Sequence, residues 1–471
     1  MVKITDPKFN NASYIDPRGR VFNYNGQIFR AFFPETAVFY KELLSSEKIV
    51  SLTKKGKIVD FDFVPDIEIE GFSLVVRQRE VPNLNYSFEW SPTMLKDAAL
   101  LTIDLAIDFC DNDILLQDAT PCNILFDSAK PTFIDLCSLA PAISGYIWSA
   151  YQQFCNLFLF PLYLFNCGDI DLTTQLMKNN NEGISAEAVI RIMSFSDKLK
   201  IPRYFSRVVL PKIMSQAITP YFNQTKIRPF LSRLIEAKKK EELQKIRQKF
   251  FRGLKKDILC LKLPSKAKKI WDNYYQQTEQ SILQKKLGVI DSVTKSLNPA
   301  TVLDIGCNTG EFSILASKAG ARVIAFDTDN YCIDMLYNKA KSGNLAILPL
   351  VMDILNPTSG MGWRGVQFKN AQERFKSEMV YALALIHHLV FINGLDFRRI
   401  IQSIKDFCNK WLIVEYISCD DPKVKLLPRR PSLDYSFYNQ DNFLKALSEQ
   451  FSEVSILPKY SDTRVLVLAK V

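Results

Sequence analysis

The most constraining feature of this chain is a short apolar run, at residues 301–305, that is followed at once by a glycine-containing turn. Such a run predicts a buried parallel strand, because strands covered on both faces are nearly continuously apolar. Gly306 and Gly310 then let the backbone approach a ligand before a helix begins. A second apolar run ends in Asp327, where a carboxylate can accept hydrogen bonds from both hydroxyls of a ribose. The pattern predicts an α/β fold that binds a nucleoside-containing cofactor.

The spacing of the turn decides between two classes of cofactor. A dinucleotide fingerprint, G-x-G-x-x-G, places a pyrophosphate on the helix N-terminus. Here its second and third glycine positions hold Asn308 and Glu311, and an acid at the start of the helix repels a pyrophosphate but tolerates a sulfonium. The run Asp304-x-Gly306-Cys-Asn308-x-Gly310 resembles motif I of the class I S-adenosylmethionine (SAM)-dependent methyltransferases. The resemblance implies SAM as cofactor and a Rossmann-like sheet.

Later segments predict the rest of a seven-stranded, doubly wound sheet. Segment 270–297 has the composition of the helix that usually precedes a methyltransferase sheet. Further strands are predicted at residues 345–350, 379–386 and 411–417, with a final hairpin from 454–458 and 464–469. The ligand crevice of such a sheet lies at the carboxyl ends of its strands. Asp353 follows the third strand, where an acid can accept a hydrogen bond from the adenine amino group.

Candidate catalytic residues follow the fourth and fifth strands. The chain has two histidines, His387 and His388, which are predicted to end the fourth strand. An imidazole there can remove a proton from a hydroxyl acceptor, although a structural histidine that caps the next helix is an equal alternative. Successive strand residues point to opposite faces, so one of the two at most should reach the crevice. Glu415 is a further candidate.

Two further segments contain weaker candidates for residues that line the crevice. Asp420 and Asp421 follow the fifth strand, and a solvated acidic loop would explain them equally well. Trp363, between the third and fourth strands, lies in an insertion that is expected over the active site. It would either stack on a substrate ring or pack beneath a lid.

Length and composition set the wider frame. A chain of 471 residues predicts two to three domains. Its ten cysteines lack paired spacings and its N-terminus lacks an apolar signal stretch, which together favour a cytoplasmic protein. The apolar segment 154–165 is shorter than the roughly 20 residues that span a bilayer. A buried core helix is the preferred interpretation.

The net charge of +10 comes from one segment. Residues 238–269 hold 13 Lys or Arg and three acids. Within it, Leu243, Ile246, Phe250 and Leu254 predict the buried face of a helix over 236–256. The basic face is a candidate for an anionic partner such as nucleic acid, anionic lipid or an acidic glycan, and a solvated helix between domains is the alternative.

The N-terminal half carries a second motif. Asp118, Asn123 and Asp135 keep the D-x-x-x-x-N spacing and the later acid that protein-kinase-like enzymes use for catalysis and magnesium binding. Strands near 20–32, 59–63 and 72–79, with helices from 35 and over 91–109, are predicted in the matching order. The resemblance implies an α+β kinase-like domain, with Asn123 and Asp135 as magnesium ligands and ATP as a second cofactor if that domain is active.

This resemblance has gaps. Leu116 stands where the kinase loop has histidine, and no clear glycine-rich phosphate loop precedes it. Arg30 occupies the expected place of the phosphate-pairing lysine and has a different donor geometry. An active small-molecule kinase and a degenerate module that binds a substrate are therefore both open, and a degenerate module is favoured.

Taken as a whole, the chain resembles a bacterial family of two-part proteins related to the host-range nodulation proteins of rhizobia. Asp-Ala-Thr-Pro-Cys-Asn at 118–123 and Ile-His-His-Leu at 386–389 are among the segments that carry this resemblance. It implies a kinase-like domain over 1–228, a basic helical linker over 229–270 and a methyltransferase domain over 271–471. It also implies a glycan-like or secondary-metabolite acceptor, by association alone. The alternative function is a kinase-type phosphotransferase with a SAM-binding regulatory half.

Overall fold

The structure is a computed structural model that describes residues 2–10, 13, 16–144, 146–179, 182–209, 238–263 and 280–471. The chain divides into two compact units. The first comprises Met1–Phe88, Pro92–Asp127 and Pro131–Pro264, and the second comprises Glu89–Ser91, Ser128–Lys130 and Ser265–Val471. The predicted linker limits at 229 and 270 lie outside the described residues, so the domain limits stay a prediction.

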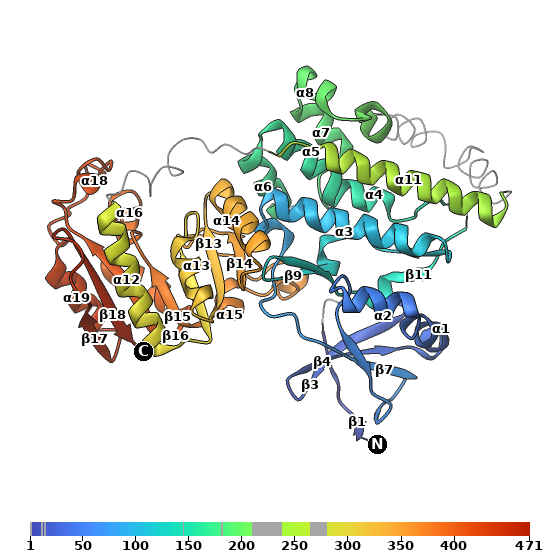
Figure 1. Ribbon diagram of the computed structural model, residues 1–471, viewed down its shortest axis with the longest axis horizontal. Coiled ribbons are helices and arrows are strands. Elements are labelled where there is room, and N and C mark those ends of the chain that lie inside the picture. Colours follow the sequence, from blue (N-terminus) through green and yellow to red (C-terminus); the bar gives the residue numbers. More distant parts are fainter. Residues whose placement is uncertain are drawn as a thin grey trace. The chain divides into compact units, whose positions relative to one another are not determined.

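The second unit is built on a seven-stranded sheet, as the sequence predicted (Figure 1). Its strands are β12 Thr301–Ile305, β13 Arg322–Asp327, β14 Ile347–Val351, β15 Ser377–Ala382, β16 Cys408–Ile417, β17 Glu453–Ile456 and β18 Arg464–Lys470. The order across the sheet is β14-β13-β12-β15-β16-β18-β17. The first five of these pair in parallel, and β18 runs antiparallel to both of its neighbours. The chain order reverses between β12 and β15, which is where a doubly wound sheet binds its ligand.

Helices alternate with these strands because amphipathic segments follow each apolar run. They are α12 Gln280–Leu297, α13 Glu311–Lys318, α14 Asn330–Gly343, α15 Ala371–Phe375, α16 Ile386–Phe391, α17 Phe397–Lys405, α18 Pro422–Lys425 and α19 Gln440–Ser448, with a 3-10 turn, η8, at Trp363–Gly365. Residues 270–279 of the predicted preceding helix lie outside the described part. In α17 the buried positions, Ile400, Ile401 and Ile404, recur at helical spacing and pack one face against the sheet.

The fourth predicted strand is too long at its end. β15 stops at Ala382 rather than at residue 386. The reason is local, because Ala384 adopts a positive φ of 50° and turns the chain into α16. His387 and His388 consequently belong to a helix, not to the end of a strand.

The first unit begins with an antiparallel sheet of order β2-β3-β4-β7-β5. Its strands and those of the smaller pairings are β1 Val2–Ile4, β2 Lys8–Phe9, β3 Gly19–Tyr24, β4 Gln27–Phe32, β5 Phe61–Phe63, β6 Ile67–Ile69, β7 Leu74–Gln78, β8 Ile114–Leu116, β9 Ile124–Asp127, β10 Lys130–Phe133 and β11 Leu139–Pro141. Helices α1 Pro34–Leu44 and α2 Glu47–Lys54 follow β4, and α3 Pro92–Cys110 follows β7. The predicted order of these strands and helices is confirmed.

The other described helices of this unit are α4 Tyr151–Phe154, α5 Phe160–Cys167, α6 Ile170–Asn179, α7 Ala186–Ile192, α8 Phe195–Lys200 and α11 Lys240–Cys260, with one π turn at Cys155–Leu159 and another at Phe205–Val209. Among them, α5 and α11 pack against α3. The apolar segment 154–165 is a buried core helix, as predicted, with Phe158, Leu162 and Leu164 fully buried. In the described part of the chain, no helix combines the length and the hydropathy needed to cross a membrane.

The buried face of helix α11 only partly matches the prediction. Leu254 is buried, as predicted, but Leu243, Ile246 and Phe250 are half-buried. The other buried side chains are Arg247, Phe251, Asp257 and Ile258. The prediction from hydropathy missed part of this face because two charged residues, Arg247 and Asp257, are buried together with hydrogen-bond partners. The guanidinium of Arg247 donates to the carbonyls of Tyr146 and Ile147, and Asp257 accepts from two arginines.

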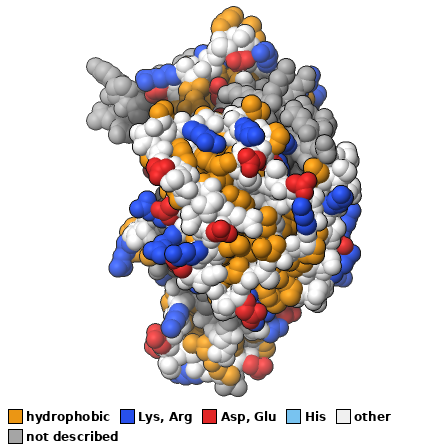
Figure 2. Space-filling view, turned by 90° about the vertical axis from the view of Figure 1, so that its left-hand side faces the viewer, with side chains coloured by type: hydrophobic (Ala, Val, Ile, Leu, Met, Phe, Trp, Pro, Cys, Tyr) orange, Lys and Arg blue, Asp and Glu red, His pale blue; other side chains and the backbone are white. Residues whose placement is uncertain are grey.

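Charged side chains are mixed on the face shown in Figure 2. There, basic and acidic groups alternate around a central area of hydrophobic side chains (Figure 2). The net positive charge of the chain is therefore not displayed as a single basic surface on that face.

Candidate functional site

The second unit contains a cavity of about 350 Å³ at the carboxyl ends of β12, β13 and β14. Its volume falls in the range of small-molecule sites, which is roughly 300–1,000 Å³. Five of the six predicted cofactor residues line it, namely Asp304, Gly306, Asn308, Asp327 and Asp353. The structure thus brings them together, and their roles stay predictions.

The sixth residue, Gly310, does not line the cavity but belongs to the turn that leads into α13. Gly306, Asn308 and Gly310 have φ values of 72°, 50° and 86°, which turn the backbone sharply between β12 and α13. A Cβ atom on Gly310 would lie 2.2 Å from a methyl carbon of Leu336. Glycine is therefore required at position 310 by both its backbone conformation and its packing against α14.

Asp327 is fixed by two backbone amides. Its carboxylate accepts from Asn308 N at 2.9 Å and from Asp329 N at 3.0 Å. An ionised carboxylate has about four acceptor sites, so two sites suffice for these amides and two can serve a ribose. Burial raises the pKa of Asp327, while the amide hydrogen bonds oppose that rise. The arrangement orients the carboxylate before any ligand binds.

Asp304 and Asp353 differ in their surroundings. Asp304 is buried and accepts a hydrogen bond from the hydroxyl of Ser313 at 2.6 Å, and burial raises its pKa to about 6. Asp353 accepts from Leu355 N at 2.8 Å and lines the cavity beyond β14. Glu311, whose negative charge at the start of the helix would repel a pyrophosphate, forms an ion pair with Lys339 at 3.1 Å.

Of the two histidines, His388 lines the cavity and His387 does not. Both lie in the first turn of α16, where neighbouring side chains point about 100° apart instead of to opposite faces. Burial lowers the pKa of His388 to about 4, and burial also lowers the pKa of His387 far below its usual range. Both imidazoles are therefore neutral near pH 7. His387 is buried, and its Nδ1 has no hydrogen-bond partner among the described residues.

Glu415 does not face the cavity. It is fully buried in β16 and accepts hydrogen bonds from Lys286 Nζ at 2.6 Å, from Ala384 N at 2.7 Å and from the hydroxyl of Tyr460. Burial opposes ionisation of Glu415, but Lys286, Arg464 and Tyr460 together outweigh it and lower the pKa of this carboxyl. Its geometry suits the positioning of other groups rather than direct contact with a substrate.

The weaker candidates also lie away from the cavity wall. Asp421 is buried and forms a two-point ion pair with Arg464, at 2.7 and 3.2 Å, so it is not part of a solvated loop. Asp420 is exposed. Trp363 is 50% exposed and does not line the cavity, so the interpretation of a ring stacked on a substrate has no support from its position.

Among the polar residues of the cavity that sequence reasoning missed are Lys286, Tyr460 and Arg464. Lys286 lies on α12, Tyr460 follows β17, and Arg464 begins β18. They belong to no spacing motif, since they meet only through the order of the strands. The places of Arg464 at the start of a predicted strand and of Tyr460 just before it were the only sequence signals, and Lys286, inside its helix, had none.

The first unit holds the second candidate site. The hydrogen-bonded hairpin of β9 and β10 lies between Asn123 and Asp135, as predicted. Asn123 Nδ2 donates to the backbone oxygen of Asp118 at 3.4 Å, and burial together with nearby Asp135 raises the pKa of Asp118. The three residues therefore cluster.

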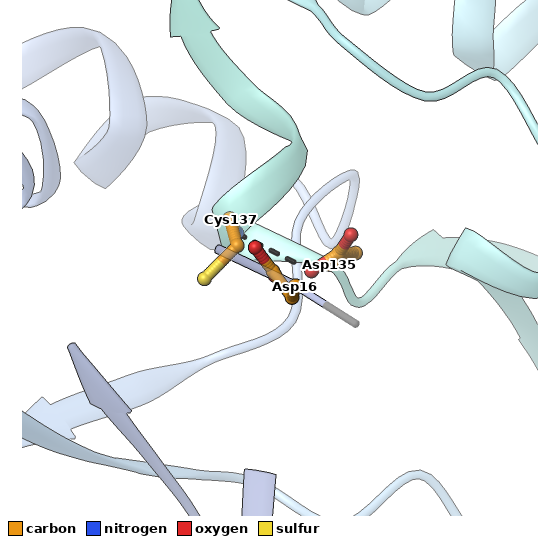
Figure 3. Close-up of side chains that lie close together, drawn as sticks. All are labelled: Asp16, Asp135 and Cys137. Carbon is orange, nitrogen blue, oxygen red and sulfur yellow. Dashed lines mark hydrogen bonds between the residues drawn. The ribbon is translucent and has the colours of Figure 1, made fainter. Parts of the chain in front are cut away.

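A cation from the protein itself occupies part of this cluster. Arg30 on β4 is buried, and its guanidinium pairs with Asp135 at 2.7 Å and with Asp16 at 3.9 Å. Asp16, Asp135 and Cys137 bring one oxygen or sulfur atom each to within 4.8 Å of one another (Figure 3). A metal ion at this place would compete with the guanidinium for the same carboxylate oxygens.

Comparison with known proteins adds a family to this geometry. Residues 240–449 match a family model described as "Methyltransferase domain". The nodulation protein NoeA of Rhizobium meliloti (strain 1021) is 30% identical over 451 residues, which cover 93% of this chain and 91% of NoeA.

Two solved structures are similar over part of the chain. The bifunctional kinase-methyltransferase WbdD aligns over 44% of this chain and 44% of its own, with 18% identity and a TM-score of 0.31. The magnesium protoporphyrin IX methyltransferase ChlM of Synechocystis PCC 6803, solved with bound SAM, aligns over 42% of this chain and 88% of its own, with 16% identity and a TM-score of 0.30. The chain thus spans less than half of WbdD.

Proposed function

The chain belongs to the family of the nodulation protein NoeA and is a SAM-dependent methyltransferase, and on that premise we propose that it methylates an oxygen of a glycan-like or secondary-metabolite acceptor. The cavity at the switch point of the sheet is the observation that carries the proposal, because His388 lines it together with the aspartates that are predicted to bind the cofactor. The resemblance to nodulation proteins supports a glycan-like acceptor. Transfer to nitrogen is the less favoured alternative.

The residues present fit SAM. Asp327 would bind the ribose hydroxyls, Asp353 the adenine amino group, and the turn at Gly306 would let the backbone approach the cofactor. The acids that line the cavity also suit a cofactor with two positive charges, the sulfonium and the ammonium. When bound, SAM supplies an electrophilic methyl group.

We propose that His388 accepts the proton of a hydroxyl acceptor. Its imidazole lines the cavity and is neutral near pH 7, because burial holds its pKa at about 4. That low pKa makes it a weak base, so the contribution of proton transfer should be modest. Glu415 would act indirectly, through the groups that it orients.

Methyl transfer itself tests the proposal. The protein would be incubated with SAM labelled in its methyl group and with a panel of glycan and small-molecule acceptors that offer either hydroxyl or amino groups. Mass spectrometry of the products identifies the methylated atom. Transfer to amino acceptors alone would refute oxygen as the target.

For the N-terminal half we propose a kinase-like module that binds a substrate or carrier without phosphoryl transfer. The clustering of Asp118, Asn123 and Asp135 supports the likeness. The ion pair between Arg30 and Asp135 argues against ATP and magnesium as its ligands, because the guanidinium already neutralises the acid that would hold the metal. A kinase-type phosphotransferase with a regulatory SAM-binding half is accordingly the disfavoured alternative.

The partner and the location of the protein also remain proposals. Helix α11 exposes Lys240, Lys245, Lys249, Arg252 and Lys256, and its N-cap residue Lys239 is exposed as well. This row of cations suits an anionic partner. We propose a cytoplasmic protein, because the ten cysteines lack the paired spacings of a disulfide framework.

A further inference from the structure

The polar groups that line the cavity are separated by charge. Its carboxylates, Asp304, Asp327 and Asp353, belong to or follow the carboxyl ends of β12, β13 and β14. Its cations, Lys286 and Arg464, lie on α12 and β18. Arg464 begins β18 and Lys286 is hydrogen-bonded to Glu415 of β16, whereas the three carboxylates belong to or follow β12 to β14 on the other side of the switch point. We call the two cations the basic half of the cavity and the carboxylates its acidic half. Lys286 Nζ also lies over the ring of Phe312 on α13, 4.8 Å from the ring centroid.

One buried carboxylate holds the basic half in place. Glu415 accepts hydrogen bonds from Lys286, Tyr460 and the amide of Ala384, and all three of these residues line the cavity while Glu415 does not. Ala384 has a positive φ, which an alanine adopts only when its surroundings impose it. The carboxylate thus fixes groups from α12, from the β17–β18 loop and from the turn after β15.

Arg464 is held in the same manner. Asp421 accepts from its Nε at 2.7 Å and from Nη2 at 3.2 Å, and Asp421 is buried outside the cavity lining. Both cations therefore line the cavity while their carboxylate partners stand behind them. Burial lowers the pKa of Lys286, Glu415 opposes this effect, and the charge of Arg464 lowers the pKa further, so the two cations are close enough to repel each other.

An anion is the ligand that suits two neighbouring, fixed cations. Fixed donors bind without paying the entropy of ordering flexible side chains. Charge-assisted hydrogen bonds from Lys and Arg to carboxylate or phosphate oxygens are also about twice as strong as neutral ones. The sulfonium and ammonium of the cofactor, in contrast, are attracted to the acidic half.

We propose that the basic half of the cavity, formed by Lys286 and Arg464, recognises an anionic group of the methyl acceptor, a carboxylate or a phosphate monoester. This inference rests on the proposed methyl transfer to an acceptor in the same cavity. It names the acceptor as acidic, and it assigns Glu415 and Asp421 as positioning residues.

The test is a titration that needs no turnover. Since His388 lines the cavity and the chain has two histidines, protein with ¹³C-labelled histidine gives an NMR signal from the site. The protein, loaded with S-adenosylhomocysteine, is titrated with acetate, inorganic phosphate or neutral acetamide at constant ionic strength. We expect saturable shifts with an anion and none with acetamide, and the stronger of acetate and phosphate identifies the type of anion.

Paired substitutions separate recognition from folding. Lys286→Met/Glu415→Gln removes both charges of one ion pair and should weaken anion binding by about tenfold or more. Arg464→Gln/Asp421→Asn removes both charges of the other ion pair. It replaces the first variant in the test if that variant fails to fold. Lys295→Met removes an exposed lysine from the same helix and should leave anion binding unchanged.

Three results would overturn the inference. Acetamide could bind as well as acetate and phosphate do, or the folded paired variants could keep wild-type anion affinity. The third is an equal loss of S-adenosylhomocysteine affinity, which would assign the cations to the cofactor's own carboxylate. Because the titration measures binding, failure of methyl transfer to glycans would not change its outcome.

Discussion

Replacing Asp327 with alanine should weaken SAM binding at least tenfold. The carboxylate lines the cavity, and its two backbone amide donors leave acceptor sites for two ribose hydroxyls. A hydrogen bond to a charged group contributes about 1.5–3 kcal/mol, so two give an upper value of about 3–6 kcal/mol. Water and the remaining contacts replace part of this binding free energy. A loss of about 1.4 kcal/mol already corresponds to a tenfold weaker affinity.

Isothermal titration calorimetry with SAM measures this loss directly, and Asp329→Ala is the matched control. Asp329 lies in the same loop and caps α14 by accepting from Tyr331 N at 2.8 Å, but it does not line the cavity. Its loss should lower stability by about 0.5–2 kcal/mol and spare SAM affinity. A folded Asp327→Ala protein with unchanged affinity for SAM would refute the ribose assignment. Equal weakening in both variants would attribute the effect to the loop.

Three further predictions test other parts of the chain. His388→Gln should lower turnover yet spare SAM binding, whereas His387→Gln should affect stability alone, as kinetics and melting curves would show. The pKa of His388 is about 4 in the folded protein, against an ordinary value of 6.5. The free energy of unfolding should therefore fall as the pH drops from 6.5 to 4, and it should fall less in His388→Gln. Gly310→Ala should destabilise the protein by more than Gly320→Ala, since both have positive φ but only the first places Cβ against Leu336; equal melting temperatures would contradict this. ATP with magnesium should leave the melting temperature of the wild type unchanged, and a rise that Asp135→Asn abolishes would instead identify an active kinase.

The sequence predicted the parts of the site that depend on short-range patterns. The strand, turn and helix at 301–318 and the acid that ends β13 are set by consecutive residues whose spacing has few structural solutions. Gly310 illustrates this, because its positive φ and its contact with Leu336 both exclude a side chain. Such positions can be recognised without knowledge of the rest of the fold.

Other parts depended on partners that are distant in the chain. The buried face of α11 was predicted from apolar residues, but Arg247 is buried because loop carbonyls more than 90 residues earlier accept its hydrogen bonds. The histidines were placed on a strand because nothing in the sequence marks the positive φ of Ala384. Lys286 and Tyr460 join the cavity through Glu415, a contact that no local pattern records.

Two carboxylates of the same sheet show why position in the chain does not decide role. Asp327 ends β13 and Glu415 lies inside β16 near its end, yet the first lines the cavity and the second is fully buried behind it. The difference lies in their donors, because amides of its own loop and of the neighbouring turn hold Asp327, whereas a lysine and a tyrosine from separate elements enclose Glu415. Removing Lys286 alone would leave a buried, unpaired charge, which typically costs about 3–5 kcal/mol. A single substitution there would therefore report on folding, and only variants that remove both charges can report on what the cavity binds.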